Sequence, residues 1–85
     1  MKIELLYFAN VRETIGRGAE TRTFGDDVKT VADVLKALGD GNDTYAAAFA
    51  RPEGLRFALD QMFVGVDARL RDGAELGIFP PVTGG

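Results

Sequence analysis

The feature that most restricts the fold of this sequence is the absence of both cysteine and histidine from a chain of 85 residues. Without cysteine no disulfide can form, and without either residue the usual structural zinc sites are excluded. A chain this short cannot hold two hydrophobic cores, since domains contain about 50–200 residues. We therefore expect one compact domain over residues 1–80, followed by a flexible tail at residues 81–85.

The charge balance argues against nucleic acid as a ligand. Thirteen acidic and ten basic side chains give a formal net charge of −3, whereas binding to phosphates needs a basic field. No apolar run approaches the roughly 20 residues of a membrane helix, and the N-terminus lacks the basic start of a signal peptide. We expect a cytoplasmic protein that binds neither nucleic acid nor a membrane.

Hydrophobic periodicity predicts an α+β domain. Residues 2–8 alternate as a strand with Ile3, Leu5 and Tyr7 on one face, and Asn10 and Glu13 have the spacing of a capping box at the start of a short helix. The i, i+3, i+4, i+7 spacing of apolar residues predicts the main helix at 30–38. The other expected elements are a strand at 19–24, a short helix at 44–49 and a last strand at 75–79. Between the last two, either two strands at 55–59 and 63–66 or one bent strand fits the period of two.

The side chains offer little catalytic chemistry. The commonest general base and the commonest covalent nucleophile are missing with histidine and cysteine. Asp40 and Asp43 share a glycine-rich bend, but residues 40–51 lack the ligand register of an EF-hand loop. We therefore expect no metal site, and no catalysis by this chain alone.

The C-terminal segment is the most distinctive part of the sequence. Pro80 and Pro81 stiffen the exit from the last predicted strand, and Gly84 and Gly85 lack the Cβ atoms that would exclude them from a narrow channel. A carboxylate at Gly85 could then be the functional group. Because a carboxylate is a poor electrophile, it would need activation as an acyl-adenylate by another protein.

A second candidate site is a recognition patch on the domain surface. Phe8, Arg12 and Phe63 are of the residue types enriched at binding hot spots. Burial in the core is the alternative fate of the two phenylalanines.

Three segments resemble the ubiquitin-like sulfur-carrier proteins, and within them the small subunits of molybdopterin synthase (the MoaD family). They are LLYFANVRE at 5–13, DGAELGIF at 72–79 and FPPVTGG at 79–85. The last segment is the most specific, because other ubiquitin-like proteins share the closing Gly-Gly but not its Phe-Pro-Pro-Val-Thr stem.

The resemblance implies a ubiquitin-like β-grasp fold, with a mixed sheet packed on one main helix. It also implies that an adenylyltransferase resembling ubiquitin-activating enzymes uses ATP to adenylate Gly85, which sulfur transfer then converts to a thiocarboxylate. The carrier would insert its tail into the large catalytic subunit of the synthase, in a heterotetramer that converts cyclic pyranopterin monophosphate to molybdopterin. No cofactor would be bound by the carrier itself.

The resemblance assigns roles to individual residues as well. Gly84 and Gly85 would form the reacting end, and the partner-binding positions would be Phe8, Arg12, Phe63, Phe79, Pro80, Pro81, Val82 and Thr83. Asp60-Gln61 departs from the Asn-Gln expected there. Two alternatives stay open: a ubiquitin-like modifier joined to lysines through Gly85, and a sulfur carrier for thiazole or cysteine synthesis.

Overall fold

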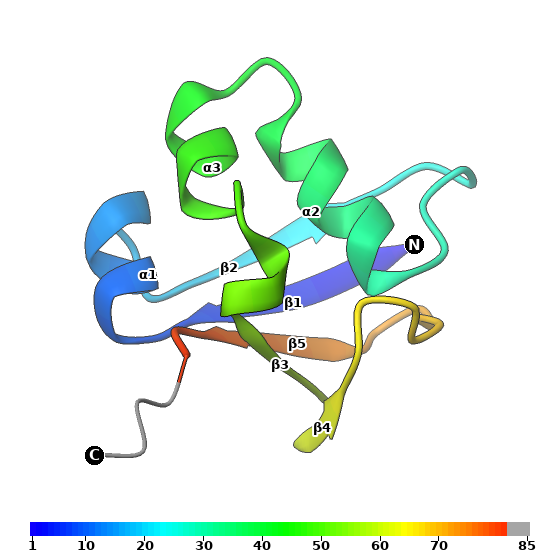
Figure 1. Ribbon diagram of the computed structural model, residues 1–85. Helices are drawn as coiled ribbons and strands as arrows, with labels where there is room; N and C mark the ends of the chain where they lie inside the picture. Colours follow the sequence, from blue (N-terminus) through cyan, green and yellow to red (C-terminus); the bar gives the residue numbers. More distant parts are fainter. Residues whose placement is uncertain (82–85) are drawn as a thin grey trace.

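The structure is a computed structural model that describes residues 1–81. Within these residues one mixed sheet has the strand order β2-β1-β5-β3-β4 (Figure 1). The strands are β1 (Lys2–Tyr7), β2 (Ala19–Thr23), β3 (Arg56–Leu59), β4 (Met62–Val64) and β5 (Glu75–Phe79). The neighbouring strands β1 and β5 are parallel, and the other pairs are antiparallel. The expected α+β fold, a mixed sheet packed on a main helix, is confirmed.

The main helix, α2 (Val31–Gly39), forms where its apolar spacing predicts it. Thr30 and Asp33 make a reciprocal capping box at its start: the Thr30 hydroxyl accepts from the Asp33 amide at 3.3 Å, and the Asp33 carboxylate accepts from the Thr30 amide at 3.1 Å. The apolar stripe of α2 is buried against the sheet. This stripe belongs to the same buried cluster as residues of β1 and β5.

Two shorter helices and a 3₁₀ turn complete the fold. They are α1 (Ala9–Ile15), α3 (Asp43–Ala48) and η1 (Pro52–Gly54). Figure 1 shows α1, α2 and α3 on the same side of the sheet. None of the helices within residues 1–81 is long and apolar enough to cross a membrane.

The predicted capping box at the start of α1 is wrong. The chain already turns at Ala9, which has φ of 50°, and Phe8 takes the N-cap position without a side-chain hydrogen bond. Asn10 therefore lies inside the first turn instead of before it. The predicted end of this helix is confirmed, because Gly16 forms a left-handed C-cap with φ of 90°.

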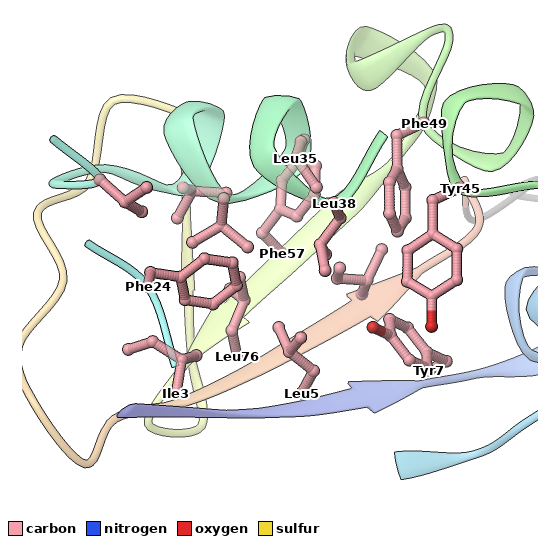
Figure 2. Packing of buried hydrophobic residues seen from close by; sticks show 14 of the residues in the cluster. Ile3, Leu5, Tyr7, Phe24, Leu35, Leu38, Tyr45, Phe49, Phe57 and Leu76 are labelled. Atoms are coloured by element: carbon pink, nitrogen blue, oxygen red, sulfur yellow. The ribbon is translucent and has the colours of Figure 1, made fainter. Parts of the chain in front are cut away.

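The core lies between the helices and one face of the sheet. Figure 2 shows Leu38 and Phe49 pointing toward Leu5 and Tyr7 of β1. Because side chains alternate along a strand, burial of Ile3, Leu5 and Tyr7 sends the intervening residues to the opposite face. We call that opposite face, which the helices leave uncovered, the open face.

Candidate functional site

The open face carries a row of small and apolar residues across four strands. Register pairs Leu6 of β1 with Gly77 of β5, Gly77 with Ala58 of β3, and Ala58 with Phe63 of β4. A groove of about 260 Å³ lies along this row. The row places apolar surface across the middle of β5, two residues before the strand ends at Phe79.

Three phenylalanines project from this part of the open face, and we call them the aromatic surface cluster: Phe8, Phe63 and Phe79. The rings of Phe8 and Phe79 are stacked, with centroids 4.2 Å apart and an interplanar angle of 1°. The Phe63 ring lies 5.9 Å from that of Phe79 and is 69% exposed. Exposed aromatic rings at such density are typical of protein-binding surfaces.

Gly77 makes the stacking possible, although it is not among the site residues predicted from the sequence. A Cβ atom at Gly77 would lie 3.1 Å from Cε1 of Phe79 and 3.4 Å from Cε2 of Phe8. Glycine in the middle of a strand is a signal of close approach by another group, and could have revealed the position. The two rings therefore occupy the space that a side chain would fill.

Replacing Gly77 with valine is expected to separate the stacked rings, because two γ-methyl groups extend beyond a Cβ that is already in tight contact with both rings. In NMR spectra, nuclear Overhauser contacts between the Phe8 and Phe79 rings should disappear. Gly54→Ala is the control, since a Cβ at Gly54 meets no atom within 4 Å. Persistence of the ring contacts in the valine variant would contradict this account.

Arg12 lies outside the aromatic surface cluster. It belongs to α1, and its guanidinium lies over Gly18, where an added Cβ would be 3.1 Å from Cζ of Arg12. The structure thus brings Phe8, Phe63 and Phe79 together, and places Arg12 beside the loop between α1 and β2.

The predicted tail begins at the aromatic surface cluster. Phe79 is the last residue of β5, Pro80 is half-buried, and the exposed Pro81 lines a groove that also contains Phe63. The predicted site residues Val82, Thr83, Gly84 and Gly85 lie outside the described residues. The last described residues of the chain are therefore next to its most exposed aromatic surface.

Asp60 and Gln61 form the two-residue turn between β3 and β4, with φ of 50° and 72°. The Asp60 carboxylate accepts from the Glu75 amide at 3.0 Å and from Arg71 at 2.9 Å. The Glu75 amide and the Arg71 guanidinium hold the pKa of Asp60 below its ordinary value. A carboxylate therefore serves as acceptor at the position where the family resemblance leads one to expect an amide.

The Glu20 side chain lies on the face of the sheet that the core covers. Its Oε2 atom accepts hydrogen bonds from the hydroxyls of Tyr7, at 2.8 Å, and Tyr45, while Arg22 and Arg17 lie 3.3 and 3.4 Å from Oε1. Burial alone would raise the pKa of Glu20, but the hydrogen bonds from Tyr45, Tyr7 and Arg22 hold it below its ordinary value.

The chemistry of the described residues is that of binding. Within residues 1–81 no group of three acidic side chains is placed to hold a metal ion, and the chain contains no histidine or cysteine. The exposed aromatic surface and the proline segment that leaves it can contact another protein.

Comparison with known proteins shows close relatives. The ThiS family model matches residues 5–85. The chain is 37% identical over 83 residues to the molybdopterin synthase sulfur carrier subunit of Escherichia coli (strain K12), covering 98% of this chain and 99% of that protein. It is also 30% identical over 93 residues to the small archaeal modifier protein 3 of Haloferax volcanii, covering 100% of both.

Solved structures of other proteins have the same fold as this chain. The solution structure of the Haloferax volcanii HVO 2177 protein matches with a TM-score of 0.80 and 31% identity, covering 100% of this chain and 87% of that one. A chain in the complex of subunits 1 and 2 of the molybdopterin-converting factor from Helicobacter pylori matches with a TM-score of 0.64 and 17% identity, covering 100% of both. The second match bears on the fold alone.

Proposed function

Because this chain belongs to the ThiS family and is a sulfur carrier, we propose that it is the sulfur-carrying subunit of a molybdopterin synthase. The observation that carries this proposal is the full-length similarity to a molybdopterin synthase sulfur carrier subunit. The aromatic surface cluster supports it, because a carrier must dock on the proteins that load and unload it.

In the proposed reaction the terminal carboxylate of Gly85 is the sulfur attachment point. A carboxylate oxygen attacks the α-phosphate of ATP on an adenylyltransferase partner, and pyrophosphate leaves. Hydrosulfide from a sulfur source then attacks the acyl carbon and AMP leaves, so that Gly85 ends in a thiocarboxylate. The carrier itself binds no cofactor, and ATP belongs to the partner.

The loaded carrier then docks on the large catalytic subunit of the synthase. The aromatic surface cluster binds that subunit, and Pro80 and Pro81 direct the tail toward the bound pterin. Val82 and Thr83 position the tail, Gly84 provides clearance, and the Gly85 thiocarboxylate gives its sulfur to cyclic pyranopterin monophosphate. Two carriers would serve two large subunits, and Arg12 would face an acidic group of a partner.

A second candidate function is protein modification. It is favoured by the 30% identity to small archaeal modifier protein 3. The same adenylated glycine would then be joined to a lysine amine of another protein, with loss of AMP. A sulfur carrier for thiazole or cysteine synthesis is a further variant of the proposed function.

The proposal predicts a thiol-reactive group at Gly85 in protein isolated from its native cells. Since the chain has no cysteine, an alkylating reagent should modify the C-terminal peptide and leave the other peptides unmodified. Mass spectrometry of the digested protein locates the adduct, and a sample hydrolysed to the carboxylate before alkylation is the control.

The two candidate functions give different results in this experiment. An adduct at the C-terminus together with co-purification of a large synthase subunit supports the proposal. Higher-mass conjugates in cell extract, with no adduct at Gly85, would favour the modifier. No adduct after incubation with ATP, a sulfur source and an activating partner would overturn the sulfur-carrier function.

A further inference from the structure

The types of side chain on the open face differ between the two ends of its strands. Phe8, Phe79 and Arg56 lie at the end from which the tail leaves. Four residues back along β5, about 13 Å away at 3.3 Å per residue, Glu75 is paired in register with Glu4 of β1. One end of the open face is therefore aromatic, and the other carries two adjacent carboxylates.

The two carboxylates belong to the same surface as the aromatic rings. Glu75 lines the same groove as Phe8, Phe63 and Phe79. In adjacent strands, about 4.8 Å apart, paired side chains project from the same face. A protein that covers the aromatic surface cluster and extends along the groove must also meet Glu4 and Glu75.

Glu4 and Glu75 are like charges in register, and no ion pair within 4 Å among residues 1–81 includes either of them. Like charges in register on neighbouring strands destabilise a sheet. The ion pairs within residues 1–81 use other carboxylates: Glu20 with Arg17 and Arg22, and Asp60 with Arg71. Lys2 lies two positions from Glu4 on the same face but makes no ion pair within 4 Å among these residues.

We propose that the protein surface covering the open face is apolar opposite the aromatic surface cluster and presents an arginine or lysine opposite the Glu4–Glu75 pair. This rests on the proposed function, because the covering protein is the large synthase subunit. The apolar contact supplies affinity but has no strict direction. The charged contact at one end of the open face fixes the orientation of the bound carrier, so that its tail enters the partner.

The test measures binding of the full-length carrier to the purified large subunit at increasing salt concentrations. The variant is Glu4→Gln with Glu75→Gln, which keeps the shape of both side chains and removes both charges. The matched control is Asp26→Asn with Asp27→Asn, which removes the same charge from the loop between β2 and α2, away from the open face. Unfolding midpoints of all three proteins establish that each is folded.

At low salt the double glutamine variant should bind about tenfold more weakly than the unaltered protein, and its affinity should depend less on salt. The control should change little. Binding of the glutamine variant within about twofold of the unaltered protein, with the same salt dependence, would overturn this inference and leave the proposed function intact. If the unaltered carrier does not bind the large subunit, both fail, and the alkylation experiment then shows separately whether the chain carries sulfur.

Discussion

A single alanine added after Gly85 is expected to abolish sulfur transfer while leaving the domain folded. The added residue moves the carboxylate away from Gly85 and places a Cβ atom beside the group that must be adenylated. Glycine at the end allows close approach of a reagent, which alanine hinders. The loss should reach at least about a hundredfold, because the terminal carboxylate of the extended chain is displaced along the tail from the position where it would react. The readout is molybdopterin formed by the reconstituted synthase.

The variant Gly85→Ala separates the two causes of this loss. It keeps the length of the chain and a carboxylate at position 85, but adds the Cβ. We expect this variant to be slower yet measurable, and both variants to unfold at the midpoint of the unaltered protein. Undiminished sulfur transfer by the extended chain would contradict the assignment of Gly85 as the reacting end.

Much of the fold could be predicted because the core residues follow simple periods. The spacing of Val31, Val34, Leu35 and Leu38 is that of one helix face, and all four are buried in α2. The start of the helix α1 was predicted wrongly because an unusual backbone angle at Ala9 begins the helix two residues early, with Phe8 in place of Asn10 as its N-cap. No propensity argument predicts a positive φ at an alanine.

The candidate site was less predictable, because it depends on pairing between distant strands. The family resemblance indicated Phe8, Phe63 and Phe79, and the structure places their rings together. A glycine in mid-strand could have marked position 77, but neither the approach of the Phe8 ring to it nor the adjacency of Glu4 to Glu75 follows from the sequence. Both depend on the register of β1 with β5. That register joins residues about 70 positions apart.

The cluster around Glu20 was missed for the same reason. Tyr7 and Tyr45 are separated from Glu20 by 13 and 25 residues along the chain. The sequence predicts a strand at 19–24 but does not indicate that the Glu20 side chain within it is only 8% exposed. The strand β2 is at the edge of the sheet, and this carboxylate ties it to β1 and to the helix α3.

Replacing Glu20 with alanine should lower the free energy of unfolding by about 3 kcal/mol. The substitution leaves two tyrosine hydroxyls without their acceptor, at about 1–3 kcal/mol for each buried group. For a domain of this size, 3 kcal/mol corresponds to a fall in Tm of about 15 °C. Urea unfolding at neutral pH measures the change, with Arg22→Ala as the control. Arg22 is 43% exposed, so its loss should cost less than about 1 kcal/mol.

The pH dependence of stability separates the contribution of the negative charge of Glu20 from the contribution of its size and hydrogen-bond acceptor. Because the folded protein holds the pKa of Glu20 below its ordinary value of 4.5, the stabilisation is complete above that value and is lost as pH falls through the lower folded pKa. Glu20→Gln keeps a hydrogen-bond acceptor but cannot titrate, so its stability should fall less steeply than that of the unaltered protein over this acidic range. Equal slopes for the two proteins, or an alanine variant no less stable than Arg22→Ala, would show that the tyrosine hydroxyls do not depend on the Glu20 carboxylate.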